Sequence, residues 1–104
     1  MTPEGKYRTA VFKKLRKMFP GCVLLKNDSN YQQGIPDWIL LYGNNWAMLE
    51  IKAHANADEQ PNQRYFVAQL DEMSFAAFIY PENEEEVLYG LQRSFAARGA
   101  TCVS

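Results

Sequence analysis

The chain has 104 residues, of which 47% are apolar, and a formal net charge of −1. This length and this apolar content predict one globular domain, residues 1–104, with room for one modest core. No apolar run approaches the roughly 18 residues that a membrane span needs, and the first ten residues lack the apolar stretch of a signal peptide. We therefore expect a cytoplasmic protein with no membrane partner.

Metal-binding and disulfide frameworks built on cysteine are not indicated. Cys22 and Cys102 lie far apart, no CxxC spacing occurs, and His54 is the single histidine. These features argue against a structural zinc site and against a disulfide-stabilised fold. We expect both cysteines to be ordinary thiols, and His54 to be a loop or strand-end residue.

Charge is distributed unevenly along the chain. Residues 1–26 hold seven basic residues and one acid, a net charge of +6, whereas the remaining residues hold eleven acids and four bases, a net charge of −7. A basic first segment on an otherwise acidic domain suggests contact with a polyanion. A solvated helix face explains the same charges equally well.

The first predicted element is a helix. Thr2 is a candidate N-cap, and Pro3 occupies the first helical position, where proline is favoured. Apolar residues then recur at helical spacing and predict a buried stripe formed by Tyr7, Val11, Leu15 and Met18. The pair Pro20-Gly21 ends this helix.

Three strands are predicted next. The first covers residues 22–27 and is followed by a polar loop, 28–34, that is rich in turn-forming residues. Two further apolar runs, at about 36–42 and 46–53, are separated by Gly-Asn-Asn, which is a hairpin signal.

The second half of the chain predicts a helix, a strand and a final helix. The helix covers about 61–72, with an inward face formed by Phe66, Leu70 and Met73. A strand at 74–80 leads to a helix at about 82–97, whose apolar face consists of Val87, Leu88, Leu91 and Phe95. The tail to Ser104 is left unassigned. The order α-β-β-β-α-β-α predicts an α/β (α+β) fold with a mixed sheet flanked by helices.

Three charged residues interrupt the apolar hairpin. A two-residue type I′ turn at Asn44-Asn45 would place Asp37 directly opposite Lys52. With side chains alternating along each strand, Asp37, Glu50 and Lys52 would then lie on one face at one end of the hairpin. A three-residue turn without a bulge would move Asp37 to the other face, so this prediction depends on the turn.

The energetics favour a metal site over a simple ion pair. Burying an ion costs roughly several kcal/mol of lost hydration, which other interactions must offset. An Asp37–Lys52 salt bridge would explain two of the three residues and leave Glu50 unexplained. A divalent cation explains all three, and Mg²⁺ is held in proteins by one or two carboxylates together with waters.

The motif resembles that of a known nuclease superfamily. Pro36-Asp37, twelve intervening residues and then Glu50-Ile51-Lys52 resemble the PD-(D/E)xK motif of metal-dependent nucleases. The surrounding order of elements is similar to the αβββαβ, restriction-endonuclease-like core of that superfamily, here with an extra C-terminal helix. Within the superfamily, the chain resembles most closely the VRR-NUC group, which is found in phages and repair nucleases. Holliday-junction resolvases share the core of this group. The resemblance covers roughly residues 2–80, in the segments TPEGKYRTAVFKKL, GIPDWILLYGNNWAMLEIKA and PNQRYFVAQL.

The resemblance implies a metal site on the hairpin. Asp37, Glu50 and the backbone carbonyl of Ile51 would bind Mg²⁺, for which Mn²⁺ would substitute. Lys52 would be the catalytic lysine beside the attacking water.

The resemblance implies two further catalytic residues. Glu4 would be the acid of the first helix, which reaches the waters of the metal or a second metal. It is also explained as an acid that stabilises the first turn of a helix. Gln63 would be the glutamine of the following helix, which supports the lysine or the phosphate, with Gln60 as a nearby competitor.

The expected function is that of a Mg²⁺-dependent DNA endonuclease that acts as a homodimer, with branched DNA such as a Holliday junction as the substrate. If the gene belongs to a phage, the protein would act in the cytoplasm of a bacterial host. Phosphate contacts would come from the first helix and the strand after it, through Lys6, Lys13, Lys14, Lys17 and Lys26. The alternative is a catalytically silent nucleic-acid-binding or interaction module with a nuclease-like fold.

Overall fold

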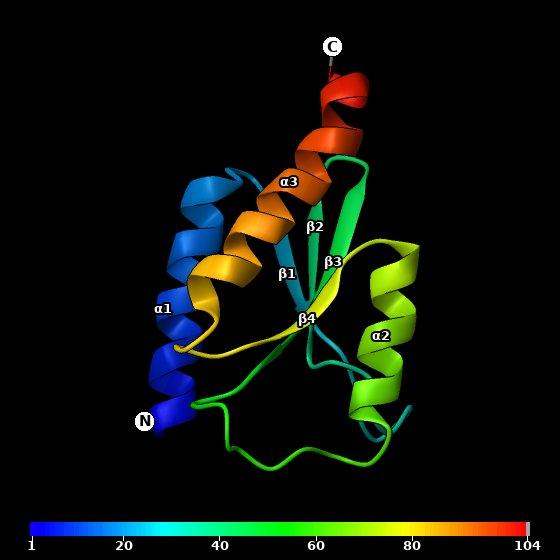
Figure 1. Cartoon of the computed structure of the whole chain (residues 1–104). Helices are drawn as coiled ribbons and strands as arrows, with labels where there is room; N and C mark the ends of the chain where they lie inside the picture. Colours follow the sequence, from blue (N-terminus) through cyan, green and yellow to red (C-terminus); the bar gives the residue numbers. More distant parts are fainter. Residues whose placement is uncertain (104) are drawn as a thin grey trace.

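A computed structural model describes the backbone of residues 1–103 and the side chains of residues 1–97. Over this range three helices and four strands follow one another (Figure 1): α1 (Pro3–Met18), β1 (Val23–Lys26), β2 (Trp38–Tyr42), β3 (Asn45–Ile51), α2 (Gln63–Met73), β4 (Ala76–Ile79) and α3 (Glu84–Val103). The predicted α+β class, the αβββαβ order and the additional C-terminal helix are confirmed. The side chain of Cys102, and Ser104, lie outside the described residues.

The strands form one mixed sheet in the order β1-β2-β3-β4. β2 pairs antiparallel with β1 and with β3, whereas β3 and β4 run parallel. Figure 1 shows α1 and α3 side by side on one face of the sheet and α2 on the other. The carboxyl end of β3 therefore lies between the start of α1 and the start of α2.

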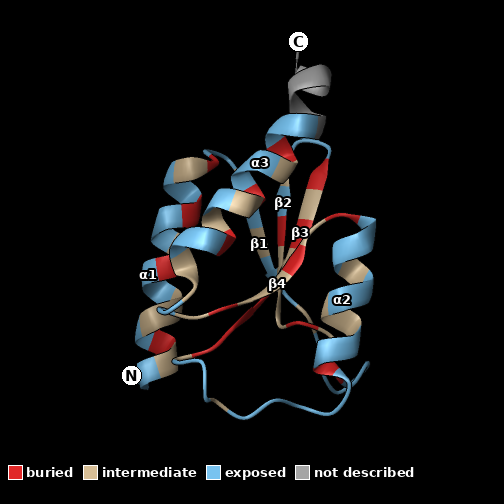
Figure 2. Cartoon of the chain, in the orientation of Figure 1, coloured by how far each residue is buried: buried red, intermediate tan, exposed pale blue. Residues whose placement is uncertain are grey.

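The core lies between the sheet and the layer formed by α1 and α3 (Figure 2). The predicted stripe of α1 is confirmed, since Val11 and Leu15 are fully buried while Tyr7 and Met18 pack at its margin. The apolar face of α3 is confirmed in the same way. The predicted cap of α1 is also present, because the Thr2 hydroxyl accepts a hydrogen bond of 3.0 Å from the Gly5 N–H.

The hairpin turn differs from the predicted one. Tyr42 pairs with Asn45, so the two turn residues are Gly43 and Asn44 rather than Asn44 and Asn45. Gly43 has φ = +61°, and Asn44 is not among the positive-φ residues, which fits a type II′ turn with glycine first. Glycine takes this conformation without the steric cost that asparagine meets, and it therefore sets the turn.

The new register changes which residues oppose each other. Continued beyond Trp38, which faces Leu49, the pairing sets Asp37 opposite Glu50, so the prediction that Asp37 faces Lys52 was wrong. The register is shifted by two residues, an even number, and side chains alternate with a period of two. Asp37 and Glu50 therefore stay on the same face of the sheet.

The face of the sheet that carries α2 is only partly covered. α2 packs on β4 and β3 and leaves the β1 and β2 side open. Val23, Leu25 and Leu41 are 47%, 48% and 37% exposed there. Met73, predicted to point inward from α2, is 62% exposed, so that prediction was wrong. Among the described residues, no helix has the length and apolarity needed to cross a bilayer.

Candidate metal and nuclease site

A polar pocket of about 770 Å³ opens where the hairpin ends. Its walls come from the first turn of α1, the end of β1, the residue before β2, the end of β3 and the start of α2. Together with the predicted phosphate-binding Lys26, all five predicted catalytic residues line it: Glu4, Asp37, Glu50, Lys52 and Gln63. Tertiary folding thus brings together residues that lie up to 59 positions apart in the chain.

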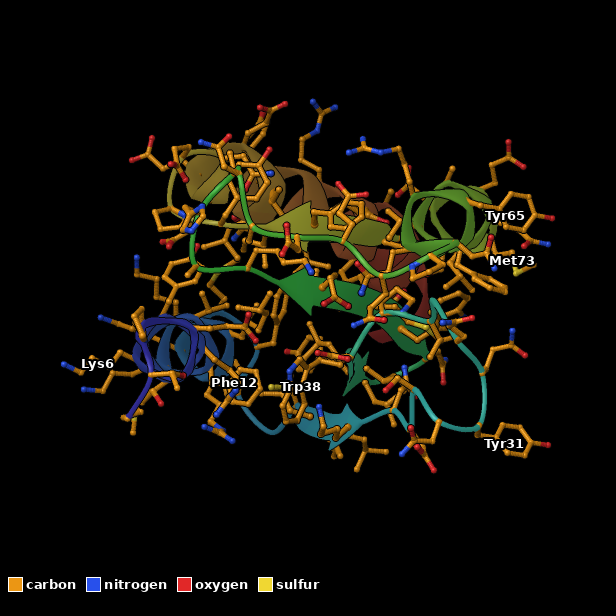
Figure 3. The ribbon with its side chains drawn as sticks, turned by 90° about the horizontal axis from the view of Figure 1, so that it is seen from below. Lys6, Phe12, Tyr31, Trp38, Tyr65 and Met73 are labelled. Atoms are coloured by element: carbon orange, nitrogen blue, oxygen red, sulfur yellow. The ribbon has the colours of Figure 1, made fainter. Side chains whose placement is uncertain are left out.

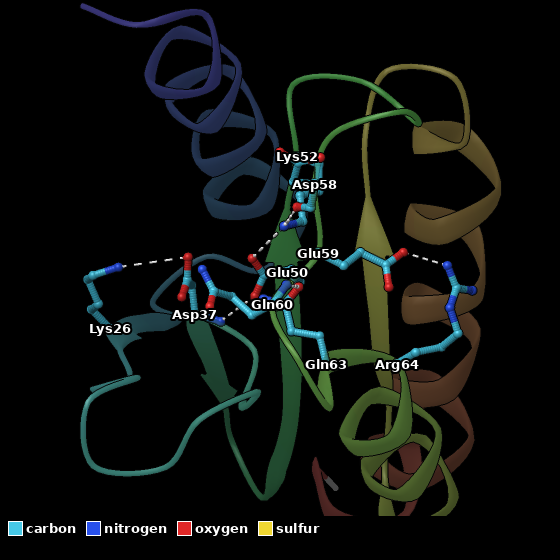
Figure 4. Close-up of polar contacts among 9 residues, drawn as sticks. All are labelled: Lys26, Asp37, Glu50, Lys52, Asp58, Glu59, Gln60, Gln63 and Arg64. Atoms are coloured by element: carbon cyan, nitrogen blue, oxygen red, sulfur yellow. Dashed lines mark hydrogen bonds and ion pairs between the residues drawn. The ribbon is translucent and has the colours of Figure 1, made fainter.

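Glu50 is the buried carboxylate of the pocket, with 3% of its surface exposed. Its Oε1 accepts a hydrogen bond of 3.0 Å from the backbone N–H of Asp37, and its Oε2 lies 3.5 Å from the Lys52 ammonium (Figure 4). Burial raises the pKa of Glu50, and the neighbouring Asp37 carboxylate raises it further. Lys52, the Asp37 N–H and a hydrogen bond from the Gln63 side chain oppose this rise in pKa. Glu50 therefore carries a costly negative charge that a cation would stabilise.

Asp37 immediately precedes β2, and hydrogen bonds of its backbone hold it in place. Its carbonyl accepts a hydrogen bond of 2.7 Å from the Asn27 N–H, and its N–H is the donor to Glu50. One carboxylate oxygen lies 3.9 Å from the Lys26 ammonium. The alternative Asp37–Lys52 salt bridge is not formed, because the register pairs Asp37 with Glu50 and brings Lys26 to its other side.

Lys52 follows β3 and is 8% exposed. Besides its contact with Glu50, its ammonium donates a hydrogen bond of 2.7 Å to the carbonyl of Asp58. The loop between β3 and α2 thus folds back over the lysine. One side of the ammonium is held by this loop, and the other is directed towards Glu50.

The backbone of Ile51 also supplies an oxygen at this edge. The Lys52 N–H bonds to the Ile79 carbonyl of β4, so the backbone groups of Ile51, one residue earlier, point towards β2. Continuing the register sets Ile51 opposite Pro36, and proline has no N–H to donate. The sheet therefore offers the Ile51 carbonyl no donor at this position.

Gln63 begins α2 and is 3% exposed. Its Oε1 accepts a hydrogen bond of 2.9 Å from the Gln60 N–H, and its side chain also bonds to Glu50. It therefore contacts the Glu50 carboxylate, and its support of the lysine or the phosphate stays a prediction. Gln60, its competitor, is exposed and lines the pocket. Glu4 reaches the same pocket from the first turn of α1.

The donor set fits a hard divalent cation. Within the described residues, no group of three or more His, Cys, Asp or Glu side chains converges on one point, and the two predicted carboxylate ligands, Asp37 and Glu50, both line the pocket. Mg²⁺ prefers one or two carboxylates and retains several waters, which suits an open polar pocket. Glu4 lines the same pocket, whereas Ile51 does not, so its carbonyl stays a predicted ligand.

The predicted phosphate-binding lysines lie in different settings. Lys26 lines the pocket, whereas Lys6 points away from it (Figure 3). Lys14 forms an ion pair with Glu84 of α3, which also accepts a hydrogen bond of 2.9 Å from the Tyr7 hydroxyl. Lys13 and Lys17 are exposed on α1.

One basic residue of α1 that contacts the start of β2 was not singled out from the sequence. Arg8 lies 5.7 Å from the ring centroid of Trp38, the residue after Asp37. The sequence did contain a signal for it, because a residue four positions after Glu4 lies on the same side of the helix. His54 is exposed in the loop after β3 and does not line the pocket.

Similarity to known proteins does not identify the chain. Comparisons with protein-family models, curated proteins and solved structures each found no match. Membership of a family is therefore not shown, and the functional argument depends on the pocket residues themselves.

Proposed function

We propose that the chain is a Mg²⁺-dependent endodeoxyribonuclease that hydrolyses phosphodiester bonds with the residues of the PD-(D/E)xK-like motif. The observation that carries this proposal is the cluster of Asp37, Glu50 and Lys52 in one pocket, with Glu50 buried and bonded to both neighbours. Burying an acid with a raised pKa beside a second acid and a lysine destabilises the fold. Perturbed groups of this kind concentrate at functional sites.

Asp37, Glu50 and the Ile51 carbonyl would hold the ion. Bound Mg²⁺ would polarise the scissile phosphate and lower the pKa of a coordinated water. Gln63 keeps the Glu50 carboxylate in place through its own hydrogen bonds. Glu4 would accept a hydrogen bond from a coordinated water.

Lys52 would act on the reacting oxygens. Its ammonium, fixed by the Asp58 carbonyl, can donate a hydrogen bond to the attacking water or offset charge that develops on the phosphate. Lys52→Ala should therefore reduce turnover and leave Mn²⁺ affinity largely intact, as measured by calorimetric titration beside cleavage kinetics.

Branched DNA such as a Holliday junction is the substrate that we propose, and a homodimer is the proposed active form, both by similarity to VRR-NUC nucleases and junction resolvases. The basic residues of α1 and β1 support a polyanionic substrate. The open apolar side of the sheet supports a partner subunit. The competing function is a catalytically silent nucleic-acid-binding module.

A plasmid-nicking assay tests the enzyme proposal. The purified protein should convert supercoiled plasmid to nicked circles with Mg²⁺, and EDTA should prevent this. Comparing a four-way junction, a flap, a duplex and single-stranded DNA would define the substrate. Binding without cleavage of any form, with Mg²⁺ or Mn²⁺, would instead support the silent module.

A further inference from the structure

Two cations that the proposed chemistry does not use lie against one indole beside the pocket. The Arg8 guanidinium is 5.7 Å and the Lys26 ammonium 5.1 Å from the ring centroid of Trp38. Phe12 packs edge-on against the same ring, with centroids 4.8 Å apart at an interplanar angle of 86° (Figure 3). Cation–π contacts at such distances orient the charged side chains, so Trp38 holds both cations close together, with Lys26 in the lining of the pocket.

The sequence brings these residues together from three elements. Trp38 opens β2 and pairs directly with Lys26, the last residue of β1. Arg8 lies one turn after Glu4 on α1, on the same side of the helix. Lys26 lines the pocket beside Asp37, and its contact with Trp38 links the pocket to Arg8, which does not line it.

Both cations can accept an anionic ligand. The nearest carboxylate to Lys26 is that of Asp37, at 3.9 Å, and the Lys26 side chain is 61% exposed. Such a long, exposed ion pair contributes little. Among the described residues Arg8 forms no ion pair, whereas Lys14 is paired with Glu84 and Lys52 with Glu50. Arg8 and Lys26 therefore differ from the basic residues that the fold already neutralises.

We propose that Arg8 and Lys26, seated on Trp38, form a phosphate clamp for the substrate strand. The clamp would bind the backbone phosphate adjoining the one at the Asp37–Glu50 site, and this inference rests on the proposed nuclease function. Lys26 supports this placement, because its ammonium lies 3.9 Å from the Asp37 carboxylate and its residue lines the same pocket.

The chemistry of the two side chains suits this role. Arginine presents a planar fork to phosphate oxygens, and lysine adds a point charge. Such contacts fix the path of the strand past the metal site without reading its sequence. The clamp therefore implies that the DNA strand follows the wall of the pocket formed by α1 and β1.

The test compares Arg8→Gln, Lys26→Gln and the double variant with the parent protein. Binding of a fluorescein-labelled four-way junction and a labelled duplex is measured by anisotropy in EDTA over a range of salt concentrations. The double variant should bind about tenfold more weakly at low salt. Its log–log salt slope should be smaller by roughly 0.9, the value for one phosphate contact on duplex DNA. Mn²⁺ affinity, measured by calorimetry, should not fall.

Arg93→Gln is the matched control, since Arg93 also stacks on an aromatic ring, at 5.6 Å from Tyr89, but on α3. It should keep the salt slope of the parent. If the parent binds and cuts DNA while the double variant keeps the parental slope, the clamp is refuted and the nuclease proposal stands. An equal change in Arg93→Gln also refutes it, since the effect would then be general charge. If the parent binds no nucleic acid, both proposals fail.

Discussion

At the residue scale, the pocket is organised around the ionisation of Glu50. The carboxylate is buried, accepts the Asp37 N–H and lies 3.5 Å from Lys52. Burial and the charge of Asp37 both raise its pKa. A negative charge of this kind destabilises the metal-free protein near neutral pH and favours the binding of a cation.

Asp37→Asn should separate these two effects. The substitution removes the repulsion on Glu50, so the metal-free variant should gain about 0.2–1 kcal/mol at pH 7, the range measured for partly exposed charge pairs. The same variant should lose the increase in melting temperature that Mn²⁺ gives the parent, and it should not cleave DNA. Thermal unfolding with and without Mn²⁺ measures both. A variant that still cleaves DNA would contradict the assignment of Asp37.

The raised pKa of Glu50 also predicts how pH acts. Because the folded state holds the proton more tightly than the unfolded state, the contribution of Glu50 to stability is fully present below the ordinary pKa of a carboxyl group. It is lost as pH rises through the raised value. Metal binding requires the carboxylate, so Mn²⁺ affinity should weaken as pH falls through the raised pKa, with proton release on binding.

Calorimetric titration in two buffers of different ionisation enthalpy measures the protons released. Glu59→Gln removes an acid that is paired with Arg64 and does not line the pocket, so it should keep the parental pH dependence. Proton release that is absent throughout mildly acidic pH would be inconsistent with a role for Glu50 in binding the metal.

At the element scale, two loops meet over the pocket. Gly34 belongs to the loop between β1 and β2 and has φ = +91°. A Cβ atom at this position would lie 2.7 Å from the Pro61 carbonyl oxygen and 2.9 Å from Asn62, in the loop before α2. That second loop carries Asp58 and leads into Gln63, so the contact at Gly34 helps to place the groups that hold Lys52 and Glu50.

Gly34→Ala should therefore cost more than backbone strain alone. Gly21→Ala is the matched control, since Gly21 has φ = +86° but nothing lies within 4 Å of a Cβ there. We expect Gly21→Ala to lose about 1 kcal/mol and Gly34→Ala to lose about 2 kcal/mol or more, because its loops must separate. Urea unfolding gives both values, and Gly34→Ala should also weaken Mn²⁺ binding. Equal losses would show that the two loops adjust freely.

At the scale of the whole molecule, the sheet is covered unequally. α1 and α3 bury one face, whereas α2 leaves β1 and part of β2 open on the other (Figure 1). Val23 and Leu41 are direct pairing partners, and Leu25 lies two residues along the same face. An exposed apolar surface of this kind is a suitable site for the proposed second subunit.

Leu25→Asp should convert a dimer to monomers in sedimentation velocity, because it places a charge on this apolar surface. Met73→Asp introduces the same charge at a 62% exposed residue of α2 and should leave the assembly unchanged. A parent protein that stays monomeric at high micromolar concentration would contradict the homodimer.

The sequence alone determined the order of elements and the buried faces of α1 and α3, because periodicity and capping are local properties. The spacing of Val11 and Leu15, the cap at Thr2 and the apolar hairpin required no knowledge of distant residues. The same local pattern identified Asp37, Glu50 and Lys52 as unusual, since charged residues in apolar strands are costly wherever the strands pair.

Only the tertiary structure decided how these charges pair. The glycine at position 43 set a turn one residue earlier than predicted, and the register then put Asp37 opposite Glu50. Lys52 therefore pairs with Glu50, and Lys26 approaches Asp37. Lys26 comes from β1, and the local sequence does not indicate which residues that strand will contact. The stacking of Arg8 on Trp38 likewise depends on how α1 packs on the sheet. Electrostatic and aromatic contacts are set by distances through space, which the fold fixes and the spacing along the chain does not.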